Sequence, residues 1–295
     1  VILLLNKILK KMDVQLDREM LKQAMNFKND DELIQAKVII LENRNIDKID
    51  SSTFHNLDNL EKLSLKNNKI KNISNEAFSQ LKNIVELDLS RNNIEKIDKD
   101  SFKNMIKLKK IDLTSNKLSS MDIEFSENST LEELFISKNE IKELNSNLFS
   151  STKNLKKLYL AHNKLTQIKN GDFSKLNASL NVLDLSENEI ESIEEDSFKD
   201  MKELIELNIS SNKLKSVKFN PYISEEVRSN KSKKDSSSNS KKDSSNNTEK
   251  DSSNNTEKDS SNNTKKDSSN NTKKKSKKPK NSEEIMQKPK KFGLI

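Results

Sequence analysis

The chain has 295 residues and a formal net charge of +7; 34% of the residues are charged, 31% are hydrophobic, two are Gly and none is Cys. Ordinary globular domains hold roughly 45–50% apolar residues, so much of this chain cannot be packed core. The composition excludes glycine-rich nucleotide loops, disulfides, thiolate metal sites and cysteine nucleophiles, and two histidines give little support for a histidine-based enzyme.

Residues 1–35 have the pattern of an amphipathic helical cap. Residues 8–27 contain no Pro or Gly, and apolar side chains follow an approximately helical spacing at Ile8, Met12, Leu16, Met20 and Phe27. No apolar run in the chain approaches the roughly 18–20 residues of a membrane-spanning helix, so we expect no transmembrane segment. We expect this segment to cover the first hydrophobic end of the structure that follows.

Residues 36–218 are built from one repeated unit, L-x-x-L-x-L-x-x-N-x-L/I. Steps of 24, 24, 23, 24, 25 and 24 residues separate the asparagines of seven units, which are Asn68, Asn92, Asn116, Asn139, Asn163, Asn188 and Asn212. A degenerate eighth unit begins at Ala36 and has Arg44 at the asparagine position. A phenylalanine recurs in phase at Phe54, Phe78, Phe102, Phe125, Phe149, Phe173 and Phe198. Repeats of this length indicate a stacked array.

These residues and their spacing resemble the leucine-rich repeat family in its typical 24-residue class, with about eight repeats and without the cysteine-rich caps of its extracellular members. The resemblance implies an α/β fold over residues 36–227: a curved solenoid, or horseshoe, with a parallel β-sheet on its concave face. It also implies a non-catalytic protein that binds a protein partner through that face, as in a receptor-ectodomain or adhesion-type fragment.

Elementary physics supports the same arrangement. Alternation along a strand sends both leucines of the L-x-L pair to one side and the intervening residue to the other. Stacked units pair their strands at roughly 4.8 Å and bury rows of Leu, Ile and Phe together. The asparagine follows the strand where the chain turns, and its amide can satisfy unpaired peptide groups. We therefore interpret the asparagine and phenylalanine columns as structural.

The residues between the two leucines are the candidate recognition surface; in chain order they are Ile40, Ser64, Asp88, Asp112, Phe135, Tyr159, Asp184 and Asn208. Phe135 and Tyr159 interrupt a polar column on adjacent strands, between Asp88 and Asp112 on one side and Asp184 on the other. Exposed aromatics beside charge are typical of interface anchors. The alternative is an aromatic pair that only stacks across neighbouring strands for local stability.

The column one residue earlier alternates in charge from Lys62 to Lys157, which indicates a surface ladder of opposite charges rather than a binding site.

No motif in the sequence predicts catalysis or metal binding. Ser79 and Lys82 match a nucleophile spacing, but Leu81 between them is a phased core residue, and the companion motifs are absent. His55 and His162 have no partner in a metal-ligand pattern. We expect no catalytic residue, no metal, no cofactor and no small-molecule substrate.

Residues 228–295 change abruptly to Lys, Ser, Asn and Asp, with four tandem octads over residues 241–272. They hold 19 Lys and Arg against 9 Asp and Glu, net +10, whereas residues 1–227 hold 35 against 38, net −3. So few apolar residues predict a disordered tail. The basic run at Lys273, Lys274, Lys275, Lys277, Lys278 and Lys280 admits nuclear import, nucleic-acid contact, or binding to an anionic membrane or polysaccharide; a solvated linker is the simpler interpretation.

Two hypotheses follow. The first is a protein-binding module acting through the concave face; the second is a scaffold whose basic tail binds polyanions. The sequence does not decide the cellular compartment, because the repeat class favours an extracellular or cell-surface location and the lack of cysteine favours an intracellular one. The chain begins with Val rather than Met, so we expect a fragment or a processed product.

Overall fold

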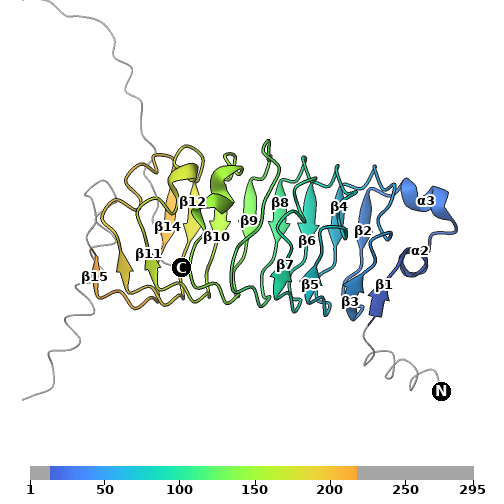
Figure 1. Cartoon of the computed structure of the whole chain (residues 1–295), viewed down its shortest axis with the longest axis horizontal. Helices are drawn as coiled ribbons and strands as arrows, with labels where there is room; N and C mark the ends of the chain where they lie inside the picture. Colours follow the sequence, from blue (N-terminus) through green and yellow to red (C-terminus); the bar gives the residue numbers. More distant parts are fainter. Residues whose placement is uncertain (1–13, 218–295) are drawn as a thin grey trace, which may run out of the picture. The chain divides into compact units, whose positions relative to one another are not determined.

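The repeats stack in sequence order into a solenoid, shown by a computed structural model that describes residues 14–217 (Figure 1). The predictions made for residues 1–13, for the last part of the solenoid at 218–227 and for the tail 228–295 lie outside the described residues. No helix within residues 14–217 is long and apolar enough to cross a membrane.

One parallel sheet of eight strands runs the length of the solenoid. Its strands in chain order are β2 (Val38–Ile40), β4 (Lys62–Ser64), β6 (Glu86–Asp88), β8 (Lys110–Asp112), β9 (Glu133–Phe135), β10 (Lys157–Tyr159), β12 (Val182–Asp184) and β14 (Glu206–Asn208). Equivalent repeat positions pair directly, as Leu63 with Leu87 and Leu158 with Leu183. The middle residue of every strand is buried. The predicted parallel sheet is confirmed.

Strands of two to four residues form the opposite wall of most coils. They are β1 (Val14–Leu16) paired with β3 (Ile46–Ile49), β5 (Asn72–Ile73) paired with β7 (Lys96–Ile97), and β11 (Gln167–Ile168), β13 (Ser192–Ile193) and β15 (Ser216–Val217) in one row. Two short 3-10 helices, η1 (Ser146–Ser150) and η2 (Ser174–Leu176), connect the walls. The core lies between the two walls as one continuous cluster.

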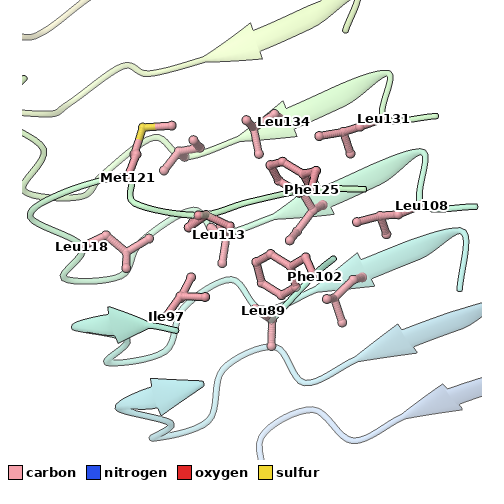
Figure 2. Close-up of a cluster of buried hydrophobic side chains, with 14 of the residues drawn as sticks. Leu89, Ile97, Phe102, Leu108, Leu113, Leu118, Met121, Phe125, Leu131 and Leu134 are labelled. Atoms are coloured by element: carbon pink, nitrogen blue, oxygen red, sulfur yellow. The ribbon is translucent and has the colours of Figure 1, made fainter. Parts of the chain in front are cut away.

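The phenylalanine column forms a spine through this core. Phe54, Phe78, Phe102 and Phe125 have successive ring centroids 5.9, 6.4 and 6.0 Å apart, and a second run joins Phe149, Phe173 and Phe198 at 6.2 and 5.8 Å. Figure 2 shows Phe102 and Phe125 among leucines from several repeats. Each ring is at most 5% exposed, so the column contributes to stability and is not a ligand site.

The asparagine column bonds each repeat to the one before it. The Asn116 side chain accepts a hydrogen bond from the Ile94 amide (2.9 Å), and its Nδ2 donates to the Leu89 carbonyl (3.1 Å) and the Leu113 carbonyl (3.0 Å). All seven asparagines make the equivalent contacts, and six are 5–8% exposed. Because the turn cannot form a regular strand ladder, these amides satisfy its buried peptide groups.

The residue before each of these asparagines has a left-handed backbone. Asn67, Arg91, Ser115, Lys138, His162, Glu187 and Ser211 have φ between 53° and 60°. This region costs most non-glycine residues roughly 1–2 kcal/mol. The backbone amide offsets part of that cost by bonding the next repeat, as from Arg91 to the Thr114 carbonyl (2.8 Å). The chain thus turns tightly in every repeat without using glycine.

The predicted N-terminal helix over residues 8–27 is wrong in its extent. Val14–Leu16 is strand β1, because it extends the outer wall beside β3, and the helix α2 spans only Arg18–Met25. A second helix, α3, spans Asp30–Ile34. Leu16, Leu21 and Leu33 are fully buried in the common core.

Two arginines attach this segment to the first coil. Arg18 binds the Asp30 carboxylate (3.0 Å) and donates to the His55 carbonyl (2.7 Å). Arg44, which replaces asparagine in the degenerate unit, donates to the Ala24 carbonyl at the end of α2 (3.1 Å). The departure from the repeat pattern therefore occurs where the neighbour is a helix rather than another coil.

The 23-residue repeat interrupts the outer wall. The missing residue lies between Met121 and Phe125, and no strand is assigned there or in the following repeat among the described residues. A hollow of about 400 Å³ lies beside β7, lined by residues that include Ile97, Asp98 and Ile123. By contrast, the extra residue of the 25-residue repeat falls in the segment that holds η2.

We expect Asn116→Ala to lower the free energy of unfolding by about 2 kcal/mol, because it leaves the buried Ile94 amide without an acceptor and removes one of the two asparagine bonds to each of the Leu89 and Leu113 carbonyls. Urea denaturation measures the change. The control Asn128→Ala removes an exposed asparagine of the next coil and should change stability by less than about 0.5 kcal/mol. Equal stability of the two variants would contradict the structural role of the column.

Candidate functional site

The solvent side of the eight-stranded sheet, here called the concave face, displays the predicted columns. Most side chains of the central column, from Asp88 to Asn208, are half-buried: they lie over the sheet with one side toward solvent. Ser64 differs, at 2% exposed, because its hydroxyl donates to Glu42 (2.8 Å) and neighbouring side chains cover it. This face therefore presents Asp, Phe and Tyr side chains in one row across adjacent strands.

Phe135 and Tyr159 stack face to face in that row. They are register partners on β9 and β10, with ring centroids 4.7 Å apart and planes inclined by 8°. The Lys110 ammonium lies 5.1 Å from the Phe135 centroid, on the neighbouring strand. The stacking predicted as the alternative therefore occurs, and both rings remain partly exposed beside each other. Stacking and partner contact are compatible, because one side of the pair still faces solvent.

The three aspartates each use one carboxylate oxygen to hold the turn after their strand. Asp88 accepts from the Ser90 amide (2.9 Å) and hydroxyl (2.6 Å), and Asp184 accepts from the Ser186 amide (3.0 Å) and hydroxyl (2.7 Å). Asp112 accepts from the Thr114 amide (2.8 Å). In the described part of the chain, their second oxygens have no hydrogen bond and none of the three forms a salt bridge. The structure thus brings all five predicted site residues into one row.

The alternating column beside this row forms ion pairs between strands. Lys62 binds Glu86 (2.7 Å), and Lys157 binds Glu133 (2.6 Å). The hydrogen bond that Lys62 donates to Glu86 raises the pKa of Lys62, and the one that Lys157 donates to Glu133 raises the pKa of Lys157. Such exposed pairs contribute little stability each, typically below about 1 kcal/mol. Their consequence is that these lysines are already neutralised by glutamates of this chain.

A shallow hollow of about 180 Å³ lies on the concave face over strands β2, β4, β6 and β8. Its lining includes Ile40, Lys62, Asp88, Lys110 and Asp112. Ile40 and its strand neighbour Val38 are 39% and 49% exposed, although other repeats have mainly polar residues in these columns. Sequence reasoning did not single out this hollow or its aliphatic end; the two aliphatic residues on one strand were the available signal.

The remaining sequence candidates lie elsewhere. His162 occupies a left-handed turn position, and its Nε2 lies 2.6 Å from a Glu187 oxygen; both side chains are exposed. Ser79 donates to the Glu76 carbonyl (3.2 Å), and Leu81 is core, as the interpretation of a chance match requires. Within residues 14–217 no group of three or more His, Cys, Asp and Glu residues is placed to hold a metal ion.

Comparisons with known proteins agree with the solenoid fold. The family model described as leucine rich repeat matches residues 34–94, 82–141, 129–179 and 178–220. Among solved structures, the crystal structure of a TLR13–ssRNA13 complex matches with a TM-score of 0.58 and 23% sequence identity. The match covers 74% of this chain and 31% of that chain, so this chain spans under a third of the length of that protein. A comparison with curated proteins finds no match.

We expect Tyr159 to ionise above the ordinary phenol value of about 10. Burial raises the pKa of Tyr159, Lys157 opposes the rise, and Glu206, Glu133 and Asp184 add to it. The unfolded chain then loses its proton first, so stability from this group is complete below about pH 10 and falls as the pH rises through the folded pKa. Tyrosinate absorbance of Tyr222→Phe isolates Tyr159, because the chain has two tyrosines. The same midpoint in folded and urea-unfolded protein would contradict the burial.

Proposed function

The chain belongs to the leucine-rich repeat family, and we propose that it is a non-catalytic recognition module that binds a protein partner through the concave face. The observation that carries the proposal is the stacked pair of Phe135 and Tyr159, half-buried in the middle of the face between carboxylates. Aromatic side chains at the centre of an interface supply large contact area at a small cost in conformational entropy.

Each repeat has buried columns that hold the structure together and outward columns that do not, and this separation supports the proposal. The asparagine, leucine and phenylalanine columns are buried and fully used in holding the coils together. The concave columns contribute little to the core and differ from repeat to repeat. Family membership makes such a surface a candidate for binding, but the fold alone does not identify the ligand.

The charge of the concave face favours a protein over a nucleic acid there. The TLR13 structure contains an RNA, which makes RNA a ligand class worth testing. On this chain, however, the central column carries Asp88, Asp112 and Asp184 and no cation, and flanking lysines such as Lys62 are paired with glutamates. A row of carboxylates without a salt bridge among the described residues disfavours phosphates.

The second candidate function, polyanion binding by the tail, rests on the sequence. The six lysines between Lys273 and Lys280 and the net charge of +10 over residues 228–295 favour it. This function would be independent of the concave face, with the solenoid acting as a scaffold. The two candidates therefore differ in location and in their dependence on salt.

We expect Phe135→Ser combined with Tyr159→Ser to abolish partner capture from a native extract while leaving the fold intact. The pair's stacking is worth about 0.5–1.5 kcal/mol, which a solenoid with this core should tolerate. Affinity capture followed by mass spectrometry identifies proteins retained by the wild-type chain and lost by the double variant. Circular dichroism checks the fold.

Ile106→Ser is the matched control, because Ile106 is 49% exposed and lies outside the eight strands. The control should retain the same proteins as the wild-type chain. If the double variant retained them as well, this surface would not be the site of recognition.

For the tail, we expect single-stranded RNA binding to weaken steeply with salt. Replacing the six lysines from Lys273 to Lys280 with glutamine should reduce the slope of log K against log salt by about four, because each lysine releases roughly 0.7 counterion on a single strand. Filter binding at several salt concentrations measures the slope. An unchanged slope would assign RNA binding to another part of the chain.

A further inference from the structure

We propose that the concave face takes an extended basic segment of its partner, with two cationic side chains four residues apart and an apolar side chain midway between them. The apolar side chain contacts the Phe135–Tyr159 pair, one cation pairs with Asp112 and the other with Asp184. This inference rests on the proposed function and deepens it by stating the chemistry of the bound segment.

The row that would hold this segment is in register across four adjacent strands. Asp112 pairs with Phe135, Phe135 with Tyr159, and Tyr159 with Asp184. The aromatic pair is therefore flanked on both sides by a carboxylate of the same column. A ligand that lies across the strands meets acid, aromatic surface and acid in that order.

The fold does not require these negative charges. Asn208 occupies the same column on β14, and its uncharged side chain accepts from the Ser210 amide (3.1 Å) and hydroxyl (2.8 Å), as Asp184 does from Ser186. An amide oxygen thus holds the turn as well as a carboxylate does. The turn therefore does not need the negative charge or the second carboxylate oxygen of Asp112 and Asp184, and both remain available to a ligand.

The chain's own cations do not neutralise them. Two columns flank the central one: the residue before it, such as Lys62 and Glu86, and the residue two positions after it, such as Glu42 and Lys66. In these two columns together, lysines and glutamates are equal in number. Lys62 and Lys157 are held by glutamates, and Lys110 lies over the Phe135 ring. Within residues 14–217 no lysine or arginine forms a salt bridge with an aspartate of the central column. The net charge of the face is therefore negative, which complements a basic ligand.

The spacing follows from strand geometry. Asp112 and Asp184 are separated by three strand steps of about 4.8 Å, roughly 14 Å in all. Four residues of an extended chain cover about the same distance at 3.3–3.4 Å each. Residues i, i+2 and i+4 of that chain point to one side, so the middle one meets the aromatic pair. Arginine suits the outer positions, because its guanidinium binds a carboxylate and stacks on aromatic rings.

The hollow on the concave face adds an independent reason. Its lining includes Asp88, Asp112 and the aliphatic Ile40, together with Lys62, which Glu86 binds, and Lys110, whose ammonium lies over the Phe135 ring. A long cationic side chain can lay its carbon stem against Ile40 and place its charge between the two aspartates. The hollow can therefore accommodate the cationic side chain that pairs with Asp112.

The test uses the full-length chain and the peptide Gly-Arg-Ser-Leu-Ser-Arg-Gly as probe. Isothermal titration calorimetry measures affinity, and fluorine NMR of fluorotyrosine-labelled protein reports the location, with Tyr222→Phe used to assign the Tyr159 signal. We expect saturable binding that shifts the Tyr159 signal. An isomer with adjacent arginines should bind several-fold more weakly, and the analogue with glutamate in place of arginine should not bind.

The decisive variant is Asp112→Asn with Asp184→Asn, which keeps the turn acceptors and removes both charges. We expect it to weaken peptide binding about tenfold. The charge-matched control Asp58→Asn with Asp200→Asn removes exposed carboxylates outside the eight strands and should leave the affinity unchanged.

Three outcomes would overturn the proposal: no binding of the peptide, equal binding of the two isomers, or equal weakening by the decisive and control variants. The proposed function fails separately. If Phe135→Ser with Tyr159→Ser loses the natural partner while Asp112→Asn with Asp184→Asn keeps it, the face is a recognition site but its ligand is not basic. If neither variant loses the partner, the site itself is misplaced.

Discussion

One asparagine amide per repeat is the interaction on which the solenoid depends. Each coil leaves its strand through a left-handed residue, and the peptide groups there have no strand to pair with. The following asparagine supplies an acceptor to the previous coil and donors to two carbonyls, as Asn116 does for Ile94, Leu89 and Leu113. Because such groups are costly to bury unpaired, this column fixes the register in which the leucines and phenylalanines stack.

A consequence of that fixed register is that equivalent outward positions align across the sheet. Phe135 and Tyr159 meet at 4.7 Å because their strands pair without a shift, and Asp112 and Asp184 flank them for the same reason. The face is thus a row of side chains at regular spacing, which suits an extended partner better than a small molecule. Variation in the outward columns changes the ligand chemistry without changing the scaffold.

The sequence alone predicted the parallel sheet, the buried columns and the asparagine ladder, because period and alternation determine them. It gave the stacking of Phe135 on Tyr159 as one of two interpretations of that pair. It did not predict that Val14–Leu16 is a strand: an apolar residue every four positions suits a helix, but pairing with β3 at the open end of the outer wall overrides that local preference. The hollow beside Asp88 and the interrupted outer wall depend on side-chain contacts and on one missing residue, which the repeat pattern does not encode.

The most direct test of the asparagine column as the basis of the fold is native-state hydrogen exchange of the full chain. The amides of Ile94, Ile141 and Leu165 lie outside the named strands and donate to asparagine side chains of the next repeat. The account predicts that they exchange as slowly as the strand amides of the eight-stranded sheet, because both open only when the coils separate. Exchange as fast as in exposed loops would contradict it and would show that the leucine core alone holds the repeats in register.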